Sequence, residues 1–359
     1  MQVITDWFRR YFSDPQIIFL TVILVLGFAV VLTMGHMLAP VLASIVIAYL
    51  LQGVVAFLQR HGWPRLAAVL LVYIAFMLFV ALVLFGIIPI LSRQVTDLVQ
   101  QLPNMISLGQ SALMQLPERY PEVFTAEQVQ EIIGSIRSEI ANFGQQVLSY
   151  SMASVIGIIT ILIYMILVPL LVFFFLKDQE LILSWFARYL PRHRRIASDV
   201  WQDVDRQISN YVRGKFWEIL LVWSVSYAVF HYFNLNYAML LGFLVGLSVI
   251  IPYIGASVVT LPVLLIAWFQ WGWTNEFFWL SISYFIIQAL DGNVLVPLLF
   301  SEVVDLHPVA IIVAILVFGG LWGFWGVFFA IPLATLVQAI LSAWPRKTDP
   351  DDLSPEMPS

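Results

Sequence analysis

The chain is organised around residues Tyr284–Pro332, which read YFIIQALDGNVLVPLLFSEVVDLHPVAIIVAILVFGGLWGFWGVFFAIP. An apolar segment runs into polar side chains at Gln288, Asp291 and Asn293 and then resumes as a second apolar segment. An ionised carboxylate at the middle of a bilayer costs about 2.5–3.5 kcal/mol on insertion scales. Because a simple membrane anchor gains nothing from that cost, we interpret Asp291 as a functional group inside a membrane domain.

The second half of the chain supplies no counter-charge for Asp291. Neither Lys nor Arg occurs between Phe216 and Pro345. The partner of Asp291 is therefore expected to be a proton, a bound metal cation, a substrate, a helix N-terminus or a basic residue from the first half. A carboxyl group in a low-dielectric setting holds a proton more readily than it does in water.

We expect Gln288 and Asn293 to join Asp291 in a substrate or ion site, because alkali cations prefer oxygen ligands such as carboxylates and amides. Tyr253 is a candidate hydroxyl facing this site, or else an ordinary interfacial tyrosine. The structural alternative for Asp291 is that it caps a helix break at Gly292 and accepts hydrogen bonds from backbone N–H groups.

Composition indicates a polytopic membrane protein. Of the 359 residues, 61% are hydrophobic and only 11% are charged, whereas charged residues make up about 25% of a soluble domain. The chain has no cysteine, which excludes disulfides and thiolate chemistry. Its five histidines lack metal-hydrolase spacing, and no ATP-binding P-loop motif occurs. We therefore expect no enzyme activity, no cofactor, no resident metal and no nucleic-acid partner.

Five full spans are predicted before the hairpin region. Gly35 and His36 are expected to form a tight turn between the first two spans, with Pro40 in the first turn of the second. Glu218, near the start of the fifth span, is expected at the membrane interface. The predicted spans cover about residues 16–34, 37–58, 66–91, 152–176 and 216–233.

Charge distribution predicts the orientation. Placing the N-terminus, the loop at Arg60, the segment Lys177–Lys215 and the C-terminus in the cytoplasm puts 14 of the 17 Lys and Arg residues there. The segment Ser92–Ser149 is then periplasmic or extracellular. The basic run within Lys177–Lys215 is typical of contact with anionic membrane lipids rather than with nucleic acid.

The segment Ser92–Ser149 carries a helix-start signal and an apolar seam. Residues Thr125–Gln128 match a capping box. The apolar residues that follow are spaced by four and three alternately, which favours packing on another helix. That partner is either the helix expected at Ser92–Met105 or another subunit. The seam consists of Val129, Ile133, Ile136, Ile140, Phe143 and Val147.

Two short-armed hairpins are predicted in the second half. Their arms are Ala238–Ile251 with Ile254–Gln270, and Val309–Leu321 with Trp325–Ala343. A helix of 14 residues rises about 21 Å, less than the roughly 30 Å of a bilayer core. Short, interrupted segments in matching positions are typical of a transporter's binding site; two ordinary hairpins of full spans are the alternative. The hairpin breaks are expected at Pro252, Gly255, Gly319, Gly320, Gly323 and Gly326, and helix kinks at Pro262, Pro297 and Pro332.

The expected fold is an all-α polytopic membrane protein. Five full spans precede two short-armed hairpins, re-entrant or fully spanning, that flank a broken span, and a small helical insertion lies in the periplasm. The expected segments are 1–91 with an N-terminal helix and three spans, 92–150 in the periplasm, 151–215 with span four and the basic segment, 216–345 as the transport half, and 346–359 as a disordered cytoplasmic tail.

Several motifs resemble those of the autoinducer-2 exporter family of bacterial membrane transporters. They are IPYIGA at 251–256, QALDGNVLVP at 288–297, LHP at 306–308 and GGLWGFWGVFFAIPLA at 319–334. The sequence is most similar to the PerM-type permeases of that family. Residues that match the family pattern are Pro252, Gly255, Gln288, Asp291, Asn293, Pro297 and Pro332.

This resemblance implies an inner-membrane transporter that is homo-oligomeric, with a pentamer as one expected form. It also implies hairpins that move as an elevator, and either export of autoinducer-2 or Na⁺(Li⁺)/H⁺ antiport.

Two classes of function follow. The first is a secondary transporter, most simply an exporter of a small solute or ion, in which Asp291 responds to a bound proton or Na⁺. The second is a membrane scaffold that does not transport and that binds envelope partners through Ser92–Ser149 and Lys177–Lys215. A scaffold would tolerate Asp291→Ala, whereas a carrier would not.

Overall fold

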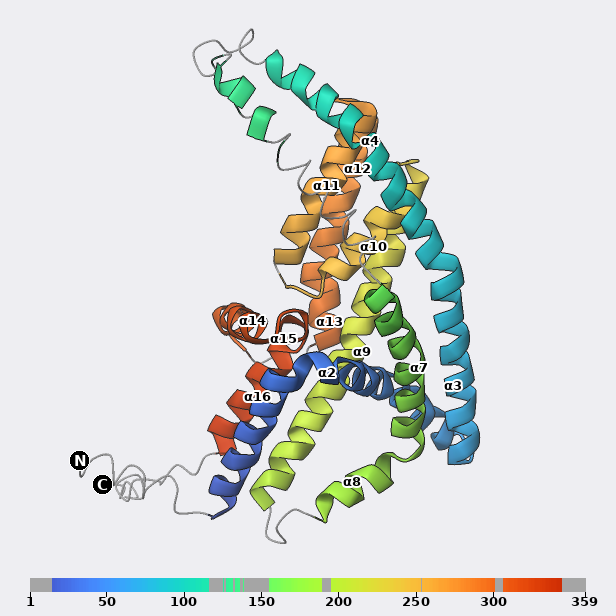
Figure 1. Ribbon diagram of the computed structural model, residues 1–359, viewed down its shortest axis with the longest axis vertical. Helices are drawn as coiled ribbons and strands as arrows, with labels where there is room; N and C mark the ends of the chain where they lie inside the picture. The colour runs from blue at the N-terminus through green and yellow to red at the C-terminus, as the bar shows by residue number, and fades with distance from the viewer. Residues whose placement is uncertain are drawn as a thin grey trace, which may run out of the picture. The chain divides into compact units, whose positions relative to one another are not determined.

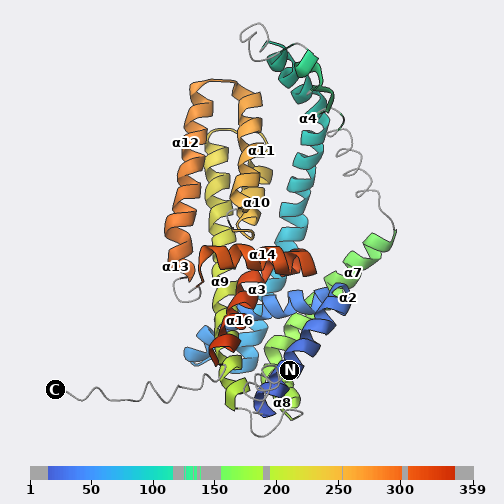
Figure 2. The ribbon, with the colours of Figure 1, turned by 90° about the vertical axis from the view of Figure 1, so that its left-hand side faces the viewer.

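The computed structural model is all-helical over the residues it describes. These are 15–115, 125, 127–131, 133–135, 138, 155–188, 195–252, 254–300 and 306–343. No strand occurs within these ranges, which confirms the expected all-α class (Figures 1 and 2). Contacts divide the chain into two compact units, each built from segments that are distant in sequence. Unit 1 comprises Met1–Leu50, Asp178–Gly214 and Phe300–Ser359; unit 2 comprises Leu51–Lys177 and Lys215–Leu299.

Several described helices are long and apolar enough to cross a membrane. Four qualify individually, and a fifth is added if Ile161–Lys177 with Gln179–Ala187 counts as one broken span. The protein is therefore a multi-pass membrane protein. The four are Met37–Arg60, Arg65–Ser111, Ile254–Trp271 and Asn275–Phe300.

Helix α2 (Pro15–Arg60) corrects the prediction for the first two spans. It is a continuous helix of 46 residues that passes through Gly35 and His36, so the predicted tight turn is wrong. A glycine inside a helix is destabilising by about 1 kcal/mol relative to alanine, which an apolar helix tolerates. Pro40 lies in the helix interior, not in a first turn. An interior proline removes one helical hydrogen bond, and the ribbon of α2 changes direction along its length (Figure 1).

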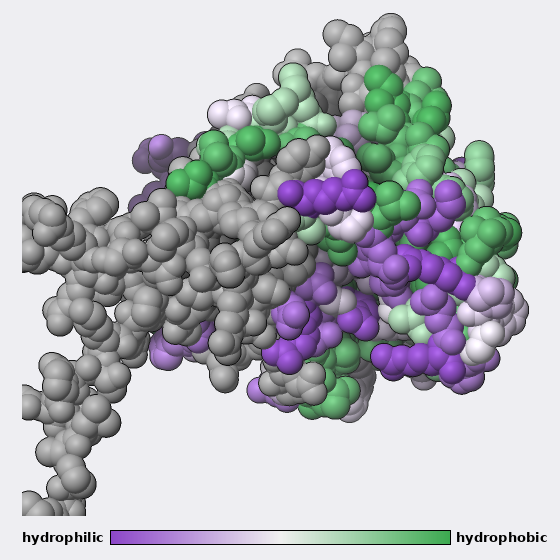
Figure 3. Space-filling view, turned by 90° about the horizontal axis from the view of Figure 1, so that it is seen from below, coloured by the Kyte–Doolittle hydropathy of each residue, from purple (hydrophilic) through white to green (hydrophobic). Residues whose placement is uncertain are grey.

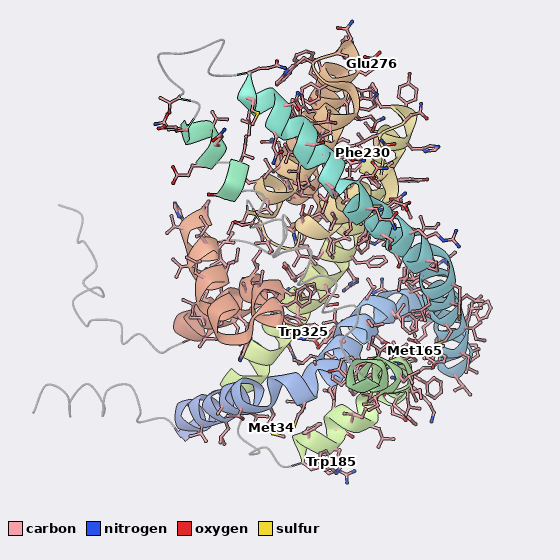
Figure 4. The ribbon with its side chains drawn as sticks, turned by 45° about the horizontal axis from the view of Figure 1, so that its top comes forward. Met34, Met165, Trp185, Phe230, Glu276 and Trp325 are labelled. Atoms are coloured by element: carbon pink, nitrogen blue, oxygen red, sulfur yellow. The ribbon has the colours of Figure 1, made fainter. Side chains whose placement is uncertain are left out.

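The remaining helices of unit 1 are α8 (Gln179–Ala187), the first part of α9 (Arg195–Tyr232), α14 (Pro308–Trp322), α15 (Phe324–Phe328) and α16 (Ala330–Ala343). Helices α14, α15 and α16 form the second predicted hairpin, in which α14 packs on both α15 and α16. Trp325 lies on α15 at this hairpin (Figure 4).

Tyr211 on α9 is buried and contacts the second hairpin. Its hydroxyl donates a 3.0 Å hydrogen bond to the carbonyl oxygen of Phe328. Pro332 lies in the first turn of α16, directly after the interruption at Phe329, so it marks a helix start.

After the last residues of α2, unit 2 continues with one long helical run. Helix α3 (Arg65–Leu82) passes through a π-helical turn, η1 (Val83–Ile87), into α4 (Ile88–Met114). The helix expected at Ser92–Met105 is therefore confirmed as part of α4. Helix α7 (Val155–Lys177) packs on α3 and corresponds to the predicted fourth span. Hydrophilic side chains gather over part of the face seen in Figure 3, beside apolar ones.

The core of unit 2 lies among α9, α10 (Ala238–Ser248), α11 (Ile254–Trp271) and α12 (Asn275–Leu290). Phe230 of α9, labelled in Figure 4, is fully buried there, as is Tyr284 of α12. Their ring centroids are 6.1 Å apart. Leu91, Leu98 and Met105 of α4 pack against this core at intervals of seven residues, which places them on one helix face.

The predicted capping box is confirmed. The backbone N–H of Gln128 donates to Thr125 Oγ1 at 3.3 Å, and the Thr125 N–H donates to Gln128 Oε1 at 3.2 Å. Val129, the first residue of the predicted seam, is 3% exposed. The seam residues from Ile136 to Val147 lie outside the described residues, so the partner of the seam stays a prediction.

Candidate functional site

The polar stretch at Asp291 forms a π-helical turn. Helix α12 continues through η2 (Asp291–Leu295) into α13 (Val296–Phe300), and the backbone N–H of Val296 bonds to the carbonyl of Asp291. The predicted broken span is therefore wrong, and so is the alternative in which Asp291 caps a helix break at Gly292. The physical reason is Pro297, which cannot donate to the carbonyl four residues earlier, so the preceding turn widens without ending the helix.

The same device occurs in the first half of unit 2. The π-helical turn η1 ends at Ile87 and is followed two residues later by Pro89, just as η2 ends at Leu295 and is followed by Pro297. Short π-helical turns are rare and occur frequently at functional sites. Only the turn at η2 carries an ionisable side chain.

Asp291 is buried in the interior of unit 2. It is 9% exposed and shares a helix face with the buried residues Tyr284 and Ile287. Its Oδ1 atom is fully buried and accepts no hydrogen bond from the described part of the chain. Buried polar groups nearly always have a hydrogen-bond partner, so an unpaired carboxylate oxygen at this position calls for a ligand or a proton.

A buried ion pair lies close to Asp291. Lys215 is 4% exposed and Glu218 is 2% exposed. The Nζ atom of Lys215 donates to Glu218 Oε2 at 2.7 Å and to the carbonyl oxygen of Val249 at 2.7 Å. Asp291 is near enough to both side chains for their charges to interact. The site therefore combines one cation with two carboxylates.

Two expectations are corrected by this arrangement. Glu218, expected at the membrane interface, is packed in the interior of unit 2. Lys215 was expected in a polar cytoplasmic segment, but it is buried and forms an ion pair with Glu218. The available signal was the spacing of Lys215 and Glu218, because residues three apart share a helix face.

A second polar group lies one turn along α12. Gln288 Nε2 donates to the hydroxyl of Tyr284 at 2.9 Å, and that hydroxyl lies 2.9 Å from Thr260 Oγ1. Thr260 Oγ1 donates to the carbonyl of Ala256 at 2.7 Å, so the proton between the two hydroxyls belongs to Tyr284. The result is a directed chain of hydrogen bonds across α11 and α12. Gln288 is among the predicted site residues, whereas Tyr284 and Thr260 are not.

The structure does not bring all predicted site residues together. Asn293 is exposed, and its Nδ2 donates to the carbonyl of Ala289 at 2.8 Å. It lies about half a helical turn away from Asp291. Tyr253 lies outside the described residues. The described residues contain no group of three His, Asp or Glu side chains that could hold a metal ion together.

The two predicted hairpin turns contain close backbone approaches. A Cβ atom on Gly255 would lie 1.8 Å from the carbonyl oxygen of Ser248, and one on Gly326 would lie 1.8 Å from that of Phe318. A Cβ on Gly319 would meet the Val327 side chain at 2.8 Å, whereas Gly320 has open space. Gly323 has φ of +59°, a conformation that favours glycine. Helix α11 continues through Pro262.

Comparison with known proteins identifies the family of this chain. A family model described as AI-2E family transporter matches residues 18–346. The chain is 46% identical over 345 residues to "Putative permease PerM" of Escherichia coli, covering 96% of this chain and 98% of that protein. It is 28% identical over 306 residues to "Putative transport protein YrrI" of Bacillus subtilis, covering 84% and 85% of the two chains. The chain thus belongs to the AI-2E transporter family.

Proposed function

We propose that this protein is a secondary transporter that exports a small solute, autoinducer-2-like in class, or an ion, and that a proton or Na⁺ drives it through Asp291. The observation that carries the proposal is the buried Oδ1 of Asp291, which is unpaired among the described residues beside the Lys215–Glu218 ion pair. We place the protein in the bacterial inner membrane as a homo-oligomer with cytoplasmic termini.

The charges of the site explain why a cation would bind there. Lys215 and Glu218 neutralise each other through a direct hydrogen bond. Asp291 is then left with a negative charge that burial disfavours. A proton or a monovalent cation at Asp291 offsets that charge, so occupancy of the site changes the local net charge by one unit. An export cycle needs such a group, because its charge must differ between the two halves of the cycle.

The first hairpin, α10–α11, can couple this change in charge to a conformational change. The carbonyl of Val249 belongs to the turn between α10 and α11, and it accepts a hydrogen bond from Lys215 within the same charged cluster. We propose that the hairpin α10–α11, whose first arm has only 11 residues, is re-entrant and moves with the charge state of the cluster. This would be an elevator-type step in which the hairpin carries the substrate past a fixed frame.

The test is to measure the flux of an autoinducer-2-type solute or of the ion itself in proteoliposomes under an imposed proton or Na⁺ gradient. We expect Asp291→Asn to abolish gradient-driven flux, because the amide cannot change charge. The matched control is Glu276→Gln, a carboxyl-to-amide change on an exposed residue in the first turn of α12 (Figure 4). Unchanged flux in Asp291→Asn would remove Asp291 from the mechanism.

The second candidate is Na⁺(Li⁺)/H⁺ antiport, which the combination of two carboxylates with one buried amine also suits. Adding Na⁺ or Li⁺ to acid-loaded proteoliposomes would release protons in an antiporter without any organic solute. A solute exporter would show proton or Na⁺ movement only when the solute is present. If the protein shows neither activity, the hypothesis of a membrane scaffold that does not transport would be favoured.

A further inference from the structure

We propose that Lys215 is a tethered cation that competes with a free monovalent cation for the carboxylates of Glu218 and Asp291, and that its displacement releases the turn between α10 and α11. The inference deepens the proposed function, and it rests on it in one respect: a monovalent cation must reach Asp291.

The ligands of the Lys215 ammonium are of the kind that bind an alkali cation. Its Nζ atom lies 2.7 Å from a carboxylate oxygen of Glu218 and 2.7 Å from the carbonyl oxygen of Val249. Carboxylate and carbonyl oxygens are the hard ligands that alkali cations prefer. A lysine ammonium is itself a compact point charge on a flexible stem. The side chain therefore marks a position that a monovalent cation of similar charge could also occupy.

The charge balance makes the two cations exclusive. The charge of one ammonium acts on two buried carboxylates, of which Glu218 also accepts a hydrogen bond from it. Asp291 lies within the range of its charge but keeps a buried oxygen without a hydrogen bond from the described residues. A free cation that binds between Asp291 and Glu218 satisfies both carboxylates. It would then weaken the hold on Lys215, because two cations placed together repel each other.

Displacement of Lys215 affects the hairpin turn through Val249. This residue ends α10, where helix carbonyls lack helical partners and attract cations. The bond from Lys215 joins residues 34 positions apart and ties the turn to α9. Ile250 follows Val249 in the turn and is 5% exposed. When Lys215 moves away, the turn loses this bond and Ile250 becomes more accessible.

The experiment uses the absence of cysteine from the chain. A single reporter, Ile250→Cys, is placed in the otherwise unchanged full-length protein and labelled with N-ethylmaleimide. Labelling is compared in NaCl, LiCl and choline chloride at one fixed pH. We expect Na⁺ or Li⁺ to accelerate labelling relative to choline. The matched control is Leu280→Cys, a fully buried position on α12, where labelling stays slow in every salt.

A second variant tests the role of Lys215. In Ile250→Cys combined with Lys215→Met, we expect labelling in choline about tenfold faster, the change expected when one hydrogen bond to a charged group is lost. The response to Na⁺ and Li⁺ should also disappear. Lys215→Arg keeps the positive charge and should retain slow labelling in choline. This variant keeps the proposal testable if the methionine variant does not fold.

Two results would overturn the proposal. One is labelling of Ile250→Cys that is independent of salt, since a purely structural ion pair would not respond. The other is a salt response that persists in Lys215→Met. Both results can be told apart from failure of the proposed function. Gradient-driven flux together with salt-independent labelling would exclude only the competition between Lys215 and a free cation. Salt-dependent labelling together with flux that does not depend on Asp291 would exclude only the coupling role of Asp291.

Discussion

The carbonyl oxygen of Ser248 approaches Gly255 so closely that a Cβ atom there would lie 1.8 Å from it. Gly326 approaches the carbonyl oxygen of Phe318 in the same way, also at 1.8 Å. The two hairpins thus close by one shared device: the second arm begins with a glycine that packs on the backbone at the end of the first. Both contacts lie seven or eight residues apart in sequence, across a turn.

Alanine at either glycine should weaken its hairpin. Gly255→Ala and Gly326→Ala must push two backbones apart, which we expect to destabilise the protein by about 1–3 kcal/mol or more. The measurement is the thermal unfolding midpoint in detergent. Gly320→Ala is the control, because Gly320 lies in helix α14 with open space around it and alanine is the better helix former. A midpoint that falls equally in all three variants would contradict the role of close approach.

Breaking the buried ion pair should be worse than removing it. Lys215→Met leaves the carboxylates of Glu218 and Asp291 buried without their cation, and we expect a loss of about 3–5 kcal/mol. Lys215→Met combined with Glu218→Leu leaves one carboxylate fewer and should recover part of that loss. Thermal midpoints of the single and double variants in detergent provide the comparison. Equal midpoints would mean that Glu218 is not the main partner of Lys215.

Tyr284→Phe should destabilise the core of unit 2. The change removes the hydroxyl that accepts from Gln288 and donates to Thr260, and leaves both groups without this partner. We expect a loss of about 1–3 kcal/mol, the penalty for an unsatisfied buried polar group. Tyr232→Phe serves as the control, because Tyr232 is 80% exposed. Adding Gln288→Leu to Tyr284→Phe should restore part of the stability; a further loss would contradict the hydrogen-bond chain.

Thr125→Ala should loosen the helical turn that follows it. The side chain of Thr125 satisfies the N–H of Gln128, and a lost N-cap costs about 0.5–2 kcal/mol. Hydrogen exchange at the amides of residues 127–131 should accelerate accordingly. Thr96→Ala is the comparison, because Thr96 lies inside α4 and only donates to the carbonyl of Ser92. Exchange that is unchanged at residues 127–131 would show that the capping box does not hold this turn.

The sequence predicted those features that depend on local chemistry. The capping box at Thr125 is a pattern of four consecutive residues, and its hydrogen bonds form within those residues. The all-helical membrane class follows from composition, since only helices or closed barrels satisfy backbone polar groups in lipid. The turns at Gly255 and Gly326 were also expected, because only glycine allows such an approach.

The predictions that failed concern residues whose local preference was overruled. Gly35 and Gly292 were read as a turn and a break, yet both lie within uninterrupted helical runs, α2 and the α12–η2–α13 span. In an apolar setting the backbone gains more from intrahelical hydrogen bonds than a glycine loses by entropy. Pro297 then decides the local form of the helix, a widened turn, without ending it.

Local sequence patterns are enough to predict the helical membrane class, the two hairpins that close at glycines, and a carboxylate, Asp291, that no basic residue follows before Arg346. The surroundings of that carboxylate depend on the tertiary structure. Packing turns the inner face of α9 toward α10 and α12, which buries Lys215 and Glu218 beside Asp291 and turns Asn293 away. The physical reason is that a side chain's electrostatic surroundings depend on which helix faces meet, and no spacing within one helix specifies its neighbour's face.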